Sequence, residues 1–164
     1  MAVTNHENEK QLYDVIKDLD ICMMTTIESD GRLLTRPMAN QEAEENGDIW
    51  FFTHHDGSVV KNLAANPQVS LGYSNASGRH AAVSGTGAEV RDRAQTEARW
   101  TEDLEAWFPE GKDDPNLTLV KVTPQRGEFW DGGSSTIVSA IGYLRTKVTG
   151  ANADDMIDHA KVSL

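Results

Sequence analysis

The residues best suited to bind a ligand lie where a strand pattern gives way to a helical one. Residues 49–53 are strong β-formers, residues 54–57 have the composition of a turn, and helical apolar spacing begins at Val59. The first N–H groups of such a helix are free, so together with the hydroxyls of Thr53 and Ser58 they could bind an anion. The alternative is a buried strand followed by a surface turn, and spacing alone leaves both interpretations open.

A second candidate is Arg36, the only Lys or Arg between Arg32 and Lys61. It lies in residues 32–38, which we expect to be the return strand of a hairpin. Because Pro37 has no N–H, this part of the strand must be an edge, a bulge or a place where a ligand replaces the neighbouring strand. A solvated charge on a strand is the other interpretation of Arg36.

Several common signatures of chemistry are missing from the sequence. It has no glycine-rich phosphate loop ending in Lys-Ser/Thr, and its single cysteine excludes a zinc site built on cysteine pairs. Ser84 lacks the Gly-x-Ser-x-Gly context of many serine hydrolases. His54 and His55 are adjacent and point apart in an extended chain, so we expect no metal site. The residues by themselves therefore do not establish catalysis.

Composition limits the class of protein. The chain has 164 residues, which suits one domain over 1–164, and 15 Lys plus Arg against 26 Asp plus Glu give a net charge of −11. This charge would repel the phosphate backbone, so nucleic-acid binding is not expected. Cys22 lies in an apolar run and should be a buried, inert thiol. Without an apolar run of about 18 residues or a signal-like N-terminus, we expect a cytoplasmic protein that does not enter a membrane.

The pattern of elements indicates a mainly β protein. An amphipathic helix is expected over about 5–18, a short one from residue 59 to before Pro67, and a longer one over 92–108. Strands are expected over 22–27, 32–38, 49–53, 68–73, 80–90, 117–122 and 128–130. Residues 131–164 are poorly determined, and 137–148 could be helix or strand. Six to seven short antiparallel strands predict a compact β-barrel with peripheral helices.

The strand at 49–53 is apolar on both faces, so something must cover its second face. An apolar stripe on the predicted helix over 92–108 is a candidate for core or subunit interface, and a ligand role for its tryptophans stays open. The large apolar side chains of the two elements exceed what one small barrel should enclose, which predicts a homodimer. They are Trp50, Phe52, Trp100, Leu104, Trp107 and Phe108.

Five short motifs occur in order along the chain: Thr35-Arg-Pro-Met38, Trp50-Phe-Phe-Thr53, Asn66-Pro-Gln-Val-Ser-Leu71, Val83-Ser-Gly85 and Trp107-Phe-Pro-Glu-Gly-Lys-Asp-Asp-Pro115. Together they resemble the pyridoxamine-phosphate-oxidase-like split barrels, and among these the bacterial general-stress-protein branch, which binds FMN. The resemblance covers about residues 18–130. It implies an FMN-binding split barrel that forms a homodimer with two FMN sites at the subunit interface, which would also cover the second face of 49–53.

Carried over position by position, the resemblance implies a set of FMN-binding residues. Lining the flavin and its phosphoribityl tail would be Arg36, Pro37, Met38, Ala39, Phe52 and Thr53, with Ser58 near the phosphate and Trp107 reaching the ring from the partner subunit. The lysine that usually binds the phosphate aligns with Val59 here, and Lys61, two residues later, would compensate together with Arg36. His80 aligns with a flavin-contacting glutamine of the pyridoxal-forming oxidases.

Two functions follow as hypotheses. The first is a flavoenzyme whose FMN is reduced by a nicotinamide or another donor and passes electrons to a small molecule. The second is a stress-related module that holds FMN, a deazaflavin or haem without turnover. The substrate-binding segment of the oxidases has no recognisable counterpart after Trp130, so oxidation of pyridoxamine phosphate is not expected.

Overall fold

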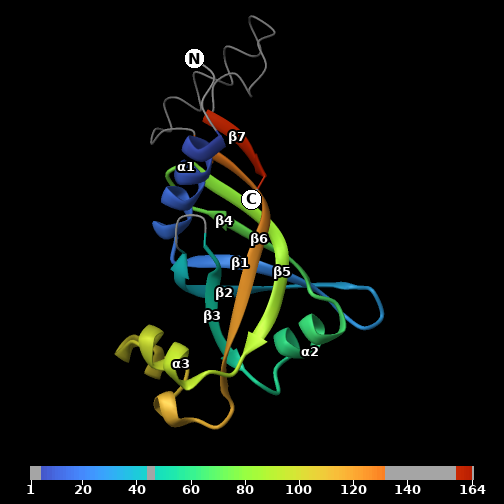
Figure 1. Ribbon diagram of the computed structural model, residues 1–164, viewed down its shortest axis with the longest axis vertical. Coiled ribbons are helices and arrows are strands. Elements are labelled where there is room, and N and C mark those ends of the chain that lie inside the picture. Colours follow the sequence, from blue (N-terminus) through green and yellow to red (C-terminus); the bar gives the residue numbers. More distant parts are fainter. Residues whose placement is uncertain (1–4, 44–46, 132–157, 164) are drawn as a thin grey trace, which may run out of the picture.

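The computed structural model describes residues 5–43, 47–131 and 158–163 (Figure 1). One antiparallel sheet runs in the order β3-β2-β1-β4-β5-β6-β7, and pairing of β3 with β6 closes β1 to β6 into a barrel. The strands are β1 (Ile21–Ile27), β2 (Leu33–Ala43), β3 (Ile49–His54), β4 (Gln68–Ser74), β5 (Arg79–Val90), β6 (Leu117–Asp131) and β7 (Asp158–Ser163). The predicted antiparallel barrel with peripheral helices is confirmed.

In the described residues, three α-helices and two short 3₁₀ helices surround the barrel. They are α1 (Asn5–Lys17), α2 (Ser58–Ala65), α3 (Arg93–Arg99), η1 (Glu102–Ala106) and η2 (Gly111–Asp113). The helix expected over about 5–18 is α1, and the short helix expected from residue 59 is α2. Strand β7 was not predicted, and the undecided stretch 137–148 lies outside the described residues.

Two helices seal the interior from opposite ends of the barrel (Figure 1). The apolar stripe of α1 is buried in the core, and Leu12 lies so close to β6 that a Cβ added at Gly127 would be 2.1 Å from its Cδ2. At the other end α2 buries Leu63, whose Cδ1 would be 2.9 Å from a Cβ at Gly87. Glycine at these positions therefore lets the helices approach the strands closely. Cys22 is buried in this core as predicted, and burial raises the pKa of its thiol to about 12.

Strand β6 differs from the prediction of two separate strands, because it runs without interruption past Pro124. Its outer edge pairs first with β3 and later with β7, and Pro124 lies in the unpaired interval between the two partners. A residue without an N–H is therefore tolerated there. On the other edge the register with β5 shifts next to Gly85, where an added Cβ would be 2.1 Å from the carbonyl oxygen of Thr123.

The second apolar face of β3 is covered by the chain itself. Trp50 and Phe52 pack in an outer cluster, separate from the barrel core, with residues of β6 and of the segment from α3 to η1. The ring of Phe52 meets Trp100 edge-on at 5.7 Å and Phe108 at 6.3 Å. We name this the outer cluster; its buried members are Trp50, Phe52, Leu104, Phe108, Leu117 and Leu119, with Val90 and Trp100 partly buried against them.

The single helix predicted over 92–108 is wrong. Asp92 caps α3 as expected, accepting a hydrogen bond from the backbone N–H of Gln95, but Trp100 is extended (φ −68°, ψ 132°) and η1 begins after Thr101. With this break, Trp100 at the break and Phe108 after it both contact the ring of Phe52 on β3. The outer cluster also accounts for most of the six large apolar side chains on which the dimer prediction rested. Of these six, only Trp107 is exposed, at 72%.

Candidate functional site

Strands β2 and β3 separate after a short paired stretch. They pair only through Asn40–Phe51, Glu42–Trp50 and Ala43–Ile49, with a register shift between Asn40 and Glu42. Residues 33–39 of β2 pair with β1 on one side, and no described strand pairs with their other side. We call this side of β2 the open edge. Pro37 lies within it, which confirms that this part of the strand is an edge.

Arg36 projects inward from the open edge, and its guanidinium is half-buried beside α2. The two Nη atoms each donate a hydrogen bond to Oγ1 of Thr26, both at 3.1 Å. Asn62 of α2 donates to the same oxygen from Nδ2 at 3.0 Å. Thr26 is fully buried, with 0% of its surface exposed. The hydroxyl of Thr26 therefore connects strand β2 to helix α2.

The surroundings of Arg36 differ from those of three other arginines. Arg32, Arg79 and Arg93 each contact at least one carboxylate within 4.0 Å. Among the residues that the structure describes, Arg36 has no carboxylate within that distance. Burial lowers the pKa of Arg36, and the more distant charge of Glu28 opposes this change. A guanidinium partly removed from water without a counterion is well suited to bind an anion.

The N-terminus of α2 is the second candidate anion-binding group, and it lies one turn before Asn62. Ser58 is its first residue, exposed, and the N-cap Gly57 makes no side-chain cap, so the first N–H groups are free of one. Ser58 precedes Asn62 by one helical turn, which puts both side chains on one face of α2. The first turn contains no acidic residue that would repel an anion. Ser58 therefore lies one turn before Asn62, which contacts the same Thr26 hydroxyl as Arg36.

The structure shows how positions 59 and 61, the two candidate places for a phosphate-binding lysine, differ in their exposure to solvent. Val59, aligned with the usual phosphate-binding lysine, is 3% exposed and belongs to the barrel core. Lys61 is exposed on α2, three residues after Ser58. A cation at position 59 would thus have to enter the core, whereas Lys61 can extend into solvent near the first turn of the helix.

The remaining predicted site residues divide into three groups. Met38 is partly buried against the barrel core, while Pro37 and Ala39 are exposed on the outer face of β2. The ring of Phe52 is occupied by the outer cluster, so only its main chain could contact a ligand at the open edge. Thr53 points to the opposite face of β3 and is half-buried.

Trp107 follows η1, on the segment that covers the outer face of β3, and it is not part of the outer cluster. Thr26 and Asn62 were not among the site residues predicted from the sequence. The sequence did contain a signal for them, because each is a polar residue at an inward position. Thr26 lies on the same inward face of β1 as Cys22 and Met24, and Asn62 lies beside Leu63 on the buried face of α2.

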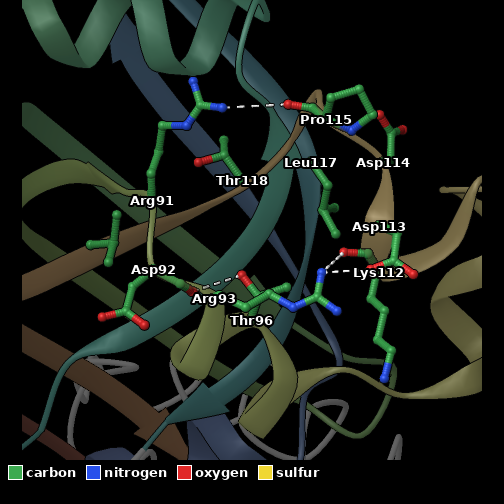
Figure 2. A pocket seen from close by; sticks show the side chains of 11 residues that line it. Arg91, Asp92, Arg93, Thr96, Lys112, Asp113, Asp114, Pro115, Leu117 and Thr118 are labelled. Carbon is green, nitrogen blue, oxygen red and sulfur yellow. Dashed lines mark hydrogen bonds and ion pairs between the residues drawn. The ribbon is translucent and has the colours of Figure 1, made fainter.

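A separate polar cavity of about 260 Å³ lies between the ends of β5 and β6 and the segment from α3 to η2 (Figure 2). Its charged groups are largely paired with one another: Arg93 contacts Asp113 at 2.7 Å and the carbonyl of Lys112 at 3.0 Å, while Asp92 caps α3. Arg91 makes one long hydrogen bond of 3.4 Å to the carbonyl of Pro115. None of the predicted site residues lines this cavity, so it is distinct from the open edge.

The described ranges 5–43, 47–131 and 158–163 contain neither a metal site nor a membrane-spanning helix. No three His, Cys, Asp or Glu side chains gather there in a group that could hold a metal ion. No helix in these ranges is both long and apolar enough to span a bilayer. The open edge of β2 with Arg36 is therefore the feature of the described chain that best fits a ligand.

Comparison with known proteins agrees with this architecture. A family model described as "Pyridoxamine 5'-phosphate oxidase like" matches residues 7–154. The pyridoxine/pyridoxamine 5'-phosphate oxidase of Streptomyces avermitilis is 26% identical over 163 residues, covering 79% of this chain and 72% of that protein. General stress protein 26 of Bacillus subtilis is 33% identical over 89 residues, covering 53% of this chain and 61% of that protein.

A solved structure extends the similarity to three dimensions. The general stress FMN/FAD binding protein from Xanthomonas citri is 30% identical, has a TM-score of 0.67, and the match covers 80% of this chain and 93% of that chain. The family model spans most of the sequence, and the split between β2 and β3 agrees with a split barrel. The chain belongs to the pyridoxamine 5'-phosphate oxidase-like family.

Proposed function

We propose that this protein binds FMN at the open edge of β2 and acts as a stress-related flavoprotein that transfers electrons to a small molecule. The observation that carries the proposal is Arg36, a half-buried guanidinium that contacts a hydroxyl and no carboxylate in the described chain. In a protein with a net charge of −11 such a group is unusual. The flavin-binding relative from Xanthomonas citri and the general stress protein from Bacillus subtilis support the same conclusion.

The residues at the open edge fit the parts of FMN. Arg36 can donate to the phosphate, and Ser58 with the first N–H groups of α2 can add neutral donors. The stretch from Pro37 to Ala39, the main chain of Phe52 and the side chain of Thr53 would line the flavin. When bound, FMN supplies hydride or single-electron transfer. The chain's own residues bind and orient it and keep its phosphate from water.

A homodimer forms part of the proposal, supported by an apolar surface that the aromatic count did not reveal. On the outer face of β1 and β2, Ile21 pairs with Ala39 and Met23 pairs with Pro37. Ile21 is 56% exposed and Met23 47% exposed, so two adjacent strands present apolar side chains to solvent. A second copy packed on this face would cover them beside the open edge. Trp107 of that copy would then contact the flavin ring, which gives its exposed indole a role.

The second hypothesis, binding without turnover, has one observation in its favour. Arg36 donates to Thr26, which also accepts from Asn62, and neither Thr26 nor Asn62 can act as a general acid or base near neutral pH. The two hypotheses differ in a direct experiment on purified protein reconstituted with FMN. Bleaching of the yellow colour by NADPH without oxygen, followed by recovery in air, would support the flavoenzyme. A stably bound flavin that no nicotinamide reduces would support the binding module.

FMN binding itself is tested by Arg36→Ala. We expect the Kd for FMN to rise at least 30-fold, about 2 kcal/mol, because one charge-assisted contact to the phosphate is lost. The matched control is Arg32→Ala, which removes an exposed arginine paired with Asp30 just before β2 and should leave the Kd unchanged. Titration followed by flavin fluorescence measures both. Equal affinity in the Arg36 variant would mean that the phosphate does not bind here.

The dimer is tested by sedimentation. Met23→Glu places a charge on the apolar outer face and should yield monomers, whereas Ala64→Glu on the exposed side of α2 should remain dimeric. A wild-type protein that sediments as a monomer at micromolar concentration, with or without FMN, would contradict the dimer. In a dimeric Trp107→Leu variant we expect weaker and more fluorescent FMN, since an indole beside the ring adds about 1 kcal/mol and quenches emission.

A further inference from the structure

The half-buried side chain of Arg36 is held in place by hydrogen bonds to a neutral group, the hydroxyl of Thr26. Two of the five N–H donors of the guanidinium, one on each Nη, converge on Oγ1 of Thr26 at 3.1 Å. A carboxylate in the same place would orient the guanidinium equally well, as Asp30 does for Arg32 and Asp18 for Arg79. It would also cancel the positive charge. A hydroxyl orients the fork and leaves its charge available.

We propose that Thr26 and Asn62 are positioning residues that hold the guanidinium of Arg36, with its charge uncompensated, at a set place relative to the first turn of α2. This inference rests on the proposed function, since it concerns the same anion site. It adds to it a neutral support that neither the motifs nor the family resemblance assigned.

Asn62 is the second residue of this neutral support, because it contacts the same hydroxyl as Arg36. Its Nδ2 donates to Oγ1 of Thr26 at 3.0 Å, so the two lone pairs of this buried oxygen are occupied by Asn62 and by the fork of Arg36. Asn62 is itself buried, with Ser58 one turn before it on the same face of α2. Arg36 of β2 is therefore connected by side-chain hydrogen bonds to Asn62, one turn after the free N–H groups of α2, before a ligand binds. A phosphate that contacts both Arg36 and the first turn of α2 would then bind without the entropic cost of ordering the arginine side chain.

The first test is Thr26→Val, which keeps the shape of the side chain and removes the shared oxygen. We expect the Kd for FMN to rise about 5- to 20-fold, and we expect no further rise when the same change is made in Arg36→Ala, because the threonine acts through the arginine. Thr26→Ser keeps the hydroxyl and should bind within about twofold of wild type. The control is Thr25→Val, which removes a neighbouring hydroxyl of β1 bonded to Thr35 and should not change the Kd.

A second measurement needs no flavin. In the ¹⁵N-labelled ligand-free protein, the guanidinium N–H signals of Arg36 should show restricted rotation in wild type and in Thr26→Ser. They should average in Thr26→Val. If wild type binds no FMN, the proposed function fails and this measurement still decides whether the support exists. If Arg36→Ala weakens FMN binding while Thr26→Val changes neither the Kd nor the signals, the inference is overturned and the proposed function stands.

If Thr26→Val does not fold, Asn62→Asp takes its place. It is close in size to asparagine and puts a carboxylate on the oxygen that holds Arg36, so the support becomes charged. We expect the Kd for FMN to rise at least tenfold because the new charge competes with the phosphate for the guanidinium. An unchanged Kd in a folded Asn62→Asp protein would show that the neutrality of the support is irrelevant, which overturns the inference.

Discussion

The two edges of β3 are built differently. On one edge β6 pairs with it without a break, from Ile49 opposite Val122 to His54 opposite Leu117. On the other edge β2 pairs with it only as far as Phe51 and then diverges past a register shift. A paired edge has its N–H and C=O groups satisfied by the neighbouring strand, whereas an open edge leaves such groups available to a ligand. Strand β3 thus belongs to the closed part of the barrel along one edge and borders the proposed site along the other.

The side chains follow the same division. Along the closed edge, β3 and β6 bury apolar residues on both faces, in the barrel core and in the outer cluster. Along the open edge, Arg36 retains a charge without a nearby carboxylate in the described chain, and Pro37 removes a backbone donor. Stability and ligand binding should therefore respond to different substitutions, and four experiments test that separation.

The largest loss of stability is expected where the outer cluster covers the closed side. Phe108→Ala removes a buried ring that contacts Phe52, His54 and Trp100, and should cost about 3–5 kcal/mol of unfolding free energy. The neighbouring Trp107→Ala alters an indole that is 72% exposed in the single chain. At concentrations where the protein is monomeric it should change the free energy by less than about 0.5 kcal/mol. Urea unfolding of both variants measures the contrast, and similar losses would contradict it.

The next effect concerns the junction of β5 and β6. Gly85→Ala would bring a Cβ to 2.1 Å from the carbonyl oxygen of Thr123, a backbone atom that cannot simply rotate away. We expect a loss of about 3 kcal/mol. Gly72→Ala on β4 makes the same chemical change where the nearest heavy atom is at 3.9 Å, and it should be nearly neutral. Thermal unfolding compares the two, and an equally stable Gly85 variant would mean that the strands adjust freely.

A smaller loss of stability is expected at alkaline pH from Cys22 of β1, which is buried in the barrel core. Burial raises the pKa of its thiol from 9.0 to about 12, so the folded state disfavours the thiolate. The stability from this group is therefore complete below pH 9 and is lost as the pH rises toward 12. By pH 11 the loss should reach about 2–3 kcal/mol. Cys22→Ala should lose less over this interval. If the free energy of unfolding of both proteins falls equally with pH, the thiol is not buried away from water.

The smallest effect is expected from Arg36 in the absence of ligand. Arg36→Met keeps the length of the apolar stem and removes a half-buried charge that has no carboxylate partner in the described chain. The unfolding free energy should change by less than about 1 kcal/mol in either direction. Chemical unfolding without flavin tests this. A loss of 3 kcal/mol or more would make Arg36 a structural residue and remove the distinction between the two edges.

Much of the barrel was predictable because its signals are local. Strand alternation, the hairpin turn at Gly31 (φ 85°) and the stripe of α1 depend on neighbouring residues, and all three agree with the structure. The errors lie where distant residues decided the outcome. Pro124 fails to end a strand because β6 changes partners around it, and Trp100 ends a helix as its ring packs on Phe52.

The candidate site divides in the same way. The residue types of the sequence were enough to single out Arg36 and Pro37 in a strand and Ser58 at the start of a helix, since a cation, a missing N–H group and a helix N-terminus each have local consequences. Only the tertiary structure decided that the hydroxyl of Thr26 on β1 joins Arg36 on β2 to Asn62 on α2. Residues so far apart in the chain contact one another only after the barrel has closed and α2 has packed against it. A hydrogen bond depends on the positions of both partners in space, and the sequence specifies one partner at a time.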